Sequence, residues 1–197
     1  MKINKIIRYV TIFFVAALMG CSQQTPIKFN ATDITGGDFG KDFQLTDHNG
    51  KSRSLADFKG KAVVMFFGYT HCPDVCPTTL STLTRAMTLL GEKAKKVQVL
   101  FVTIDPTRDT QALLAKYVPA FNPEFLGLYG DEAATAKVAK DYRIFYQKQQ
   151  ANGSKNYDMD HSAGTYIIDP AGKLRLFVSY GQGAENIAQD LSVILAN

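Results

Sequence analysis

One continuous apolar run, Ala62-Val-Val-Met-Phe-Phe67, constrains the fold of this chain more than any other feature. It has the length of a strand and lacks the polar alternation of a strand with one solvent face, so it predicts a strand buried on both faces. A second, largely apolar run extends from Val97 to Ile104. Between the two runs, apolar residues at positions 80, 83, 87 and 90 follow helical spacing. The pattern predicts a strand–helix–strand unit.

The alternation of strands and helices continues on both sides of this unit. Upstream, residues 43–46 and 51–55 flank Asp47-His-Asn-Gly50, and an Asn-Gly pair suits a tight hairpin turn. Downstream, the same criteria predict helices over about 109–117, 131–142 and 184–195, and strands near 125–128, 143–147, 164–169 and 174–180. The expected fold class is α/β, with a central mixed β-sheet flanked by helices and an N-terminal β-hairpin.

The first 20 residues have the pattern of an export signal. Three basic residues precede an apolar run over residues 9–19. This run is shorter than the roughly 20 residues that a membrane-spanning helix needs. It ends at Leu18-Met-Gly-Cys21, which resembles a bacterial lipobox, where the cysteine is lipidated. The alternative is an ordinary secretory signal that leaves Cys21 as a free thiol.

The expected organisation is therefore a lipoprotein signal peptide over 1–20, a flexible tether over 21–40 and one folded domain over 41–197. The tether is expected because residues 22–40 are polar and glycine-rich. Lipid on Cys21 would anchor the chain to a bilayer in the cell envelope, facing the extracytoplasmic (periplasmic) side.

The charge of the chain argues against nucleic acid as a partner. The formal net charge of +4 lies mostly in the signal segment. Without its three basic residues, 19 basic residues face 18 acidic ones. A net charge near +1 does not provide the one-sided basic field that binding to a phosphate backbone requires.

The segment after the first buried strand carries the candidate chemistry. It reads Gly68-Tyr-Thr-His-Cys72-Pro-Asp-Val-Cys76-Pro77 and precedes the expected helix, at the sheet edge where open α/β sheets place their sites. Two cysteines four residues apart on an opening helical turn would share one face, about 5–6 Å apart. The helix N-terminus should favour their thiolates. They could bind one metal ion or form a disulfide, and these two uses compete.

A third ligand is needed for a metal, and the three histidines are the candidates. His161 ends a polar segment directly before an apolar strand, which fits a metal ligand and an ordinary loop histidine equally well. Asp160 could hold the other imidazole nitrogen or only cap the turn. His48 lies in the expected hairpin turn and is expected to be solvated, and His71 is expected to tune the thiols electrostatically. Two thiolates and an imidazole form a soft set that suits Cu(I), and Cu(II) with an added oxygen ligand, whereas structural zinc needs a fourth ligand.

Three blocks of the sequence resemble the signature blocks of the Sco/SenC family. They are Phe67–Pro77, Ile104-Asp-Pro-Thr-Arg-Asp-Thr110 and Tyr157-Asp-Met-Asp-His161. The resemblance implies a thioredoxin-like fold, copper bound by Cys72, Cys76 and His161, and a metallochaperone role in assembling the dinuclear copper centre of cytochrome c oxidase. It implies as a partner the subunit that holds this centre. Because the cysteine pair would tend to close to a disulfide in an oxidising compartment, a thiol reductant or another copper carrier is expected as a further partner.

The middle block leaves two interpretations open. Asp105, Arg108 and Asp109 could orient the site or contact a partner. A local Asp–Arg pair, with Asp109 capping the next helix, explains them equally well.

The principal alternative function is enzymatic, a thiol-disulfide oxidoreductase that uses Cys72 and Cys76 on an exported partner or in redox sensing. Three features argue against it. The cysteine spacing is Cys-x3-Cys, the chain has no Trp, and no proline lies between Pro123 and Pro170 to act as the cis-proline of thioredoxins. A peroxiredoxin is set aside because its Pro-x3-Thr-x2-Cys pattern is missing.

Overall fold

The computed structural model of the protein describes residues 28–150 and 157–196. The expected signal peptide and Cys21 lie outside the described residues. Among the described helices, none combines the length and the apolar character that crossing a membrane requires.

The expected mixed sheet with helices on both sides is present. Eight strands form it in the order β1-β10-β9-β4-β5-β6-β2-β3, and β7 pairs with β8 in a separate two-stranded sheet. The strands are β1 (Thr32–Asp33), β2 (Leu45–Asp47), β3 (Ser52–Arg53), β4 (Ala62–Gly68), β5 (Val97–Thr103), β6 (Leu126–Tyr129), β7 (Tyr146–Gln150), β8 (Tyr157–His161), β9 (Thr165–Ile168) and β10 (Leu174–Val178).

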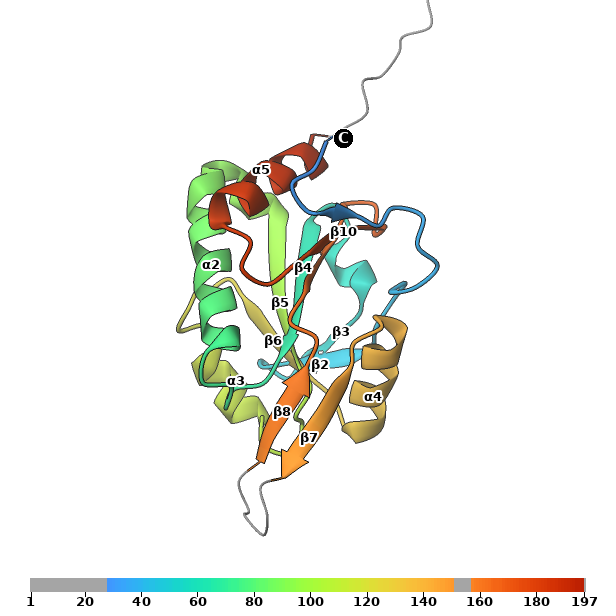
Figure 1. Ribbon diagram of the computed structural model, residues 1–197, viewed down its shortest axis with the longest axis vertical. Coiled ribbons are helices and arrows are strands. Elements are labelled where there is room, and N and C mark those ends of the chain that lie inside the picture. The colour runs from blue at the N-terminus through green and yellow to red at the C-terminus, as the bar shows by residue number, and fades with distance from the viewer. Residues whose placement is uncertain (1–27, 151–156, 197) are drawn as a thin grey trace, which may run out of the picture.

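The helices cover the central strands from two sides. The α-helices are α2 (Val75–Leu90), α3 (Gln111–Tyr117), α4 (Glu132–Asp141) and α5 (Ala184–Ile194), and the short 3-10 helices are η1 (Leu55–Phe58) and η2 (Gly91–Lys96). Helices α2, α3 and α5 lie on one side of the sheet and α4 lies on the other (Figure 1).

The two apolar runs of the sequence form the centre of this sheet. Strands β4 and β5 are parallel and every residue of both is buried. Alternate side chains of β4 serve opposite layers, since Phe66 packs against Phe101 of β5 and the next residue, Phe67, packs against Tyr142 at the end of α4. Burial of each such ring contributes about 1.5–3 kcal/mol, which fixes the end of β4 where the cysteine segment begins.

The predicted N-terminal hairpin is present as β2 and β3, and Gly50 takes the positive φ of 83° that its turn needs. The expectation that His48 is solvated was wrong. Its side chain is only 8% exposed, because β2 also pairs with β6 and draws the turn onto the sheet. There the backbone N–H of Gly127 donates to His48 Nδ1 over 3.0 Å.

Part of the segment expected to be a tether lies on the domain. Thr32 and Asp33 pair with β10, and the backbone N–H groups of Asn30 and Ala31 both donate to the buried carboxylate of Asp190 on α5. A two-residue edge strand is too short to show a periodic pattern, which explains why the sequence did not indicate it.

Strand β8 was also missed, because residues 157–161 were expected to form a polar loop. They pair along their length with β7, which begins at Tyr146, three residues later than the strand expected near 143. Strand β7 is entirely polar after Tyr146. In β8, apolar Tyr157 and Met159 alternate with polar residues, but two apolar side chains in five residues are too short a repeat to distinguish a strand from a loop.

Candidate metal centre

The two cysteines come from different local structures at the end of β4. Helix α2 begins at Val75, so Cys76 lies in its first turn whereas Cys72 lies in the preceding loop. The expectation that both occupy the opening helical turn therefore holds only for Cys76. They are nevertheless adjacent, since the backbone N–H of Cys76 points to Cys72 Sγ over 3.4 Å. Both thiols are free.

Cys76 fits into a space that a glycine provides. Its side chain is fully buried, and a Cβ atom added to Gly68 would lie 2.7 Å from Cys76 Sγ. Burial raises the pKa of the Cys76 thiol well above its ordinary value, and the neighbouring Cys72 raises that pKa further. The expected preference for thiolate does not hold at Cys76, because desolvation outweighs the helix N-terminus. A bound cation would reverse this balance, since a coordinating thiol is deprotonated.

His161 completes a cluster with these thiols although it is 85 residues from Cys76 in the sequence. It ends β8, and its Nε2 lies 3.8 Å from Cys76 Sγ. The ligand atoms of Cys72, Cys76 and His161 all lie within 4.8 Å of one another. The three residues that the sequence singled out are therefore brought together.

The ring of His161 is oriented for its Nε2 to act as a ligand. Its Nδ1 lies 2.9 Å from the carbonyl oxygen of Ser162, which can only accept, so Nδ1 carries the proton and Nε2 keeps its lone pair. Burial lowers the pKa of His161, which favours the neutral imidazole. Of the two roles considered for Asp160, the structure does not show the contact with the imidazole. Its carboxylate accepts from Gln149 Nε2 across the hairpin, and the carbonyl oxygen of Ser162 accepts from the imidazole.

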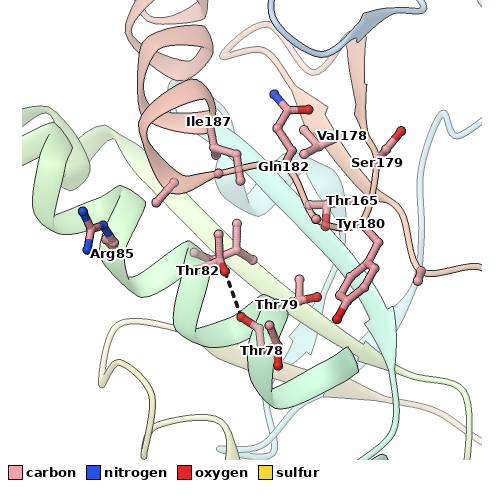
Figure 2. Close-up of a pocket in the computed structure, with 15 residues that line it drawn as sticks. Thr78, Thr79, Thr82, Arg85, Thr165, Val178, Ser179, Tyr180, Gln182 and Ile187 are labelled. Atoms are coloured by element: carbon pink, nitrogen blue, oxygen red, sulfur yellow. Dashed lines mark hydrogen bonds between the residues drawn. The ribbon is translucent and has the colours of Figure 1, made fainter. Parts of the chain in front are cut away.

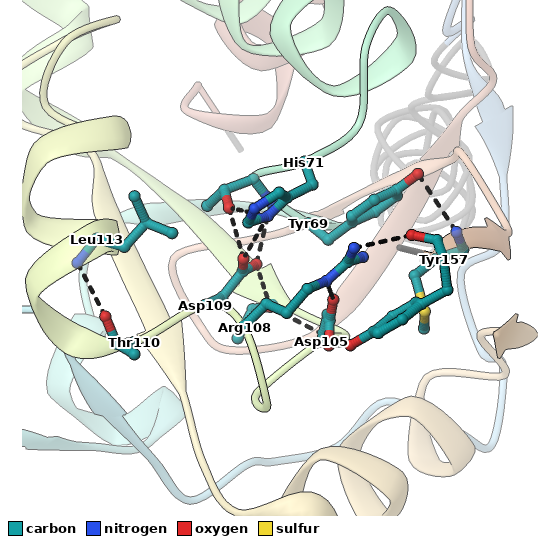
Figure 3. Close-up of polar contacts among 11 residues, drawn as sticks. Tyr69, His71, Asp105, Arg108, Asp109, Thr110, Leu113 and Tyr157 are labelled. Atoms are coloured by element: carbon teal, nitrogen blue, oxygen red, sulfur yellow. Dashed lines mark hydrogen bonds and ion pairs between the residues drawn. The ribbon is translucent and has the colours of Figure 1, made fainter. Parts of the chain in front are cut away.

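Asp109 anchors the cysteine loop and does not cap α3. Its buried carboxylate accepts from the backbone N–H and the hydroxyl of Thr70, and from the hydroxyl of Thr103 on β5 (Figure 3). The cap of α3 is the hydroxyl of Thr110, which accepts from the N–H of Leu113. His71 is half exposed, with Nδ1 3.8 Å from Asp109 Oδ1. Sequence reasoning missed this anchor, because a buried carboxylate and a helix cap look alike in the sequence.

Arg108 and Asp105 form the expected pair, but they also contact a residue that the sequence analysis did not single out. Arg108 Nη1 donates to the carbonyl oxygen of Tyr157 over 2.8 Å, and the Tyr157 hydroxyl donates to Asp105 Oδ1 over 2.7 Å. The guanidinium also lies 3.6 Å from the centre of the Tyr157 ring (Figure 3). The only signal for Tyr157 was its place at the start of the block that ends in His161.

A pocket of about 280 Å³ adjoins the cysteine helix without including the three soft donors. It lies between α2, the loop that follows β10 and the start of α5, and Thr78, Thr79 and Tyr180 line its end beside the first turns of α2 (Figure 2). The hydroxyls of Thr79 and Thr82 donate to carbonyl oxygens of their own helix, so they are not free to donate to a ligand. Copper would thus be held outside this pocket.

Comparison with known proteins identifies the family. The family model described as SCO1/SenC matches residues 31–196. The chain belongs to the SCO1/SenC family. The Protein SCO2 homolog, mitochondrial, of Bos taurus is 40% identical over 152 residues, which are 76% of this chain and 57% of the bovine protein. The chain thus spans somewhat over half the length of that relative.

Solved structures of this family share the fold. Bradyrhizobium japonicum ScoI with copper bound superposes with a TM-score of 0.73 at 40% identity, over 79% of this chain and 99% of the ScoI chain. Yeast Sco1 with copper bound gives a TM-score of 0.72 at 29% identity, over 80% of this chain and 88% of the yeast chain. The thioredoxin-like fold class is therefore confirmed.

Proposed function

We propose that this SCO1/SenC protein binds one copper ion through Cys72, Cys76 and His161 and passes it on during assembly of the dinuclear copper centre of cytochrome c oxidase. The observation that carries the proposal is the cluster of two sulfurs and one imidazole nitrogen within 4.8 Å, drawn from two separate elements of the fold. Two relatives of known structure, from Bradyrhizobium japonicum and yeast, bind copper, which supports the choice of metal.

The donor set itself favours Cu(I). Among the described residues, no fourth Cys, His, Asp or Glu belongs to the cluster, so the four-ligand set of structural zinc is incomplete. Thiolates and imidazole together select copper over hard cations. Copper is the cargo of the protein in this proposal, and the partial exposure of Cys72 and His161 leaves the ion accessible to an accepting protein.

Copper titration of the reduced protein tests this assignment. We expect one ion per chain in the wild type, and no tight binding after Cys72→Ser or Cys76→Ser, because each variant leaves one thiolate and one imidazole. Cys21→Ser is the matched control, because it removes the thiol that the proposal does not use. Undiminished affinity in both Cys72→Ser and Cys76→Ser would refute the ligand set.

The oxidised protein should not bind copper tightly. A disulfide between Cys72 and Cys76 would remove both thiolates and leave His161 as the only strong donor, so loading would require a thiol reductant. Copper titration of the disulfide form tests whether oxidation prevents binding. In the reduced protein, alkylation of the thiols should slow when copper is bound. If copper did not bind but the protein reduced disulfides of an exported partner, the oxidoreductase alternative would replace this proposal.

The same proposal places the protein on a membrane of the cell envelope. The sequence motif Leu18–Cys21 supports lipid on Cys21 after removal of residues 1–20, and a domain that faces the extracytoplasmic side could meet an oxidase subunit there. Several acyl chains bind a bilayer far more firmly than one. Metabolic labelling with a radioactive fatty acid should mark the wild type and leave Cys21→Ser unlabelled. Label on Cys21→Ser would contradict the anchor.

A further inference from the structure

His161 and the cysteines belong to separately built parts of the molecule. The cysteines follow β4, at the centre of the eight-stranded sheet, whereas His161 lies on β8. Among the described strands, β7 and β8 pair only with each other. No backbone ladder therefore joins β8 to the main sheet. The chain after His161 reaches the sheet at Thr165, which pairs with Phe66 of β4, so the base of the hairpin is tethered and side-chain contacts must set how the rest of β8 lies.

His161 is at the base of this hairpin and Tyr157 is at its outer end. In the register of the pair, His161 faces Tyr146 and Tyr157 faces Gln150. Four residues of strand extend about 13 Å. A hairpin held only at its base could rotate as a lever, so contacts at Tyr157 have the greatest effect on how β8 lies against the cysteine loop.

Three side chains fasten that outer end. Arg108 donates to Asp105 Oδ2 and to the carbonyl oxygen of Tyr157, and it stacks on the Tyr157 ring. The Tyr157 hydroxyl donates to the second carboxylate oxygen of Asp105. The Asp105 side chain is fully buried, so its charge is compensated inside this arrangement. We call Asp105, Arg108 and Tyr157 the clasp.

Tyr69 lies between the clasp and the metal ligands. The Tyr69 hydroxyl accepts from the backbone N–H of Met159 in the middle of β8. The Tyr69 ring also meets the His161 ring edge to face, with 5.8 Å between the centroids. Tyr69 is three residues before Cys72, so the cysteine loop and β8 are in direct contact along the line from Tyr157 to His161.

We propose that the clasp is the positioning device of the copper site, and that Arg108 is a positioning residue which sets the Nε2 atom of His161 against the sulfurs of Cys72 and Cys76. This inference rests on the proposed function. Arg108 has the geometry for this task because a guanidinium can donate in two directions while its face stacks on a ring, which an ammonium cannot do.

The test compares Arg108→Lys with a matched control in the first hairpin. Arg53 pairs with Asp47 there, and the exposed fractions of the two side chains are 19% and 0%, against 20% and 0% for Arg108 and Asp105. Arg108→Lys should weaken copper affinity about 10- to 100-fold, the range typical when a group that orients a ligand is lost, and should alter the Cu(II) absorption spectrum. Arg53→Lys should change neither.

A second variant and a metal-free measurement separate positioning from general stability. Tyr157→Phe removes only the hydroxyl contact to Asp105 and keeps the stacked ring, so its effect on affinity should be smaller than that of Arg108→Lys. In the protein without metal, amide hydrogen exchange should accelerate in β8 of Arg108→Lys while β4 and β5 keep wild-type rates.

The outcomes distinguish the clasp from the copper site. If Arg108→Lys bound copper with wild-type affinity and spectrum while Cys76→Ser did not bind, the clasp would be refuted and the ligand set would stand. If Cys72→Ser and Cys76→Ser both bound copper with wild-type affinity, the proposed function itself would fail. Equal losses in Arg108→Lys and Arg53→Lys would show a general stability effect and would also refute the clasp.

Discussion

Two hairpins of this protein each carry a histidine, and the two rings are held in opposite ways. In the β2–β3 hairpin, the N–H of Gly127 donates to Nδ1 of His48, so this nitrogen supplies the lone pair and Nε2 carries the proton. In the β7–β8 hairpin, Nδ1 of His161 donates to the Ser162 carbonyl and Nε2 keeps its lone pair. Of these two histidines, only His161 therefore presents a nitrogen with a free lone pair on the side of its ring away from the backbone contact.

The difference follows from how each hairpin joins the molecule. Strand β2 pairs with β6, so the first hairpin extends the main sheet and His48 becomes part of its packing. The second hairpin forms its own sheet and meets the body through side chains. A histidine built into a sheet serves stability, whereas one on a separately attached hairpin can serve binding. The following predictions test this contrast.

The largest expected effects come from removing each histidine ring in turn: one variant should lose stability and the other should lose copper affinity. His48→Ala should lower the free energy of unfolding by about 2–4 kcal/mol, because it opens a cavity and leaves the buried N–H of Gly127 without its acceptor. Its copper affinity should not change. His161→Ala should lower copper affinity by more than about 100-fold, since loss of a ligand should exceed loss of a residue that orients one.

Urea unfolding gives the stability of both variants, and copper titration gives their copper affinity. Each variant is the control for the other, because one histidine ring is removed in both. A His161→Ala protein that lost as much stability as His48→Ala, with copper binding intact, would contradict the assignment of the two roles.

A smaller effect is expected when a methyl group is added beneath the first hairpin. A Cβ atom on Gly127 would lie 3.0 Å from Val118, 3.3 Å from Leu114 and 3.5 Å from His48 Nδ1. Gly127→Ala should therefore destabilise the protein by about 1–3 kcal/mol through overpacking.

Gln149→Ala in the second hairpin is the comparison, because it removes only the exposed contact with Asp160 and should change stability little. Thermal unfolding of both variants checks the order, and equal stabilities would show that the first hairpin is not packed more tightly than the second.

The elements that the sequence predicted correctly are those whose side chains carry a pattern. The β4 and β5 runs are apolar because both faces are covered, and α2 shows its buried stripe through Leu80 and Leu83. The family resemblance is confirmed by the match over residues 31–196. Strand β1 has two residues and therefore no repeat to detect, and the apolar–polar alternation of β8 consists of Tyr157 and Met159 alone.

The candidate site was predictable in composition but not in detail. The sequence indicated Cys72, Cys76 and His161, and the structure brings them together. It did not indicate that Asp109 holds Thr70 or that Tyr157 closes the clasp, because both contacts join residues about 40 to 50 positions apart. It also placed His48 in solvent, because the pairing of β2 with β6 depends on a chain crossing that local patterns do not show.

The smallest expected effect is a pH dependence that belongs to the first hairpin. Burial lowers the pKa of His48 below its usual 6.5, although the neighbouring Asp47 opposes this shift. The unfolded chain therefore takes up a proton at His48 before the folded protein does, and protonation of Nδ1 would break the bond from Gly127. The contribution of His48 to the free energy of unfolding should be constant above about pH 6.5 and should fall as the pH decreases below this value. It should level off below the pKa of His48 in the folded protein. Each pKa unit between the two states corresponds to about 1.4 kcal/mol.

The pKa of His161 is lowered too, so the measurement is the difference in urea midpoint between wild type and His48→Gln at pH 7.5 and pH 5.0. The wild type should lose more stability than the variant over this interval, and equal losses would mean that the protonation of His48 is not linked to folding.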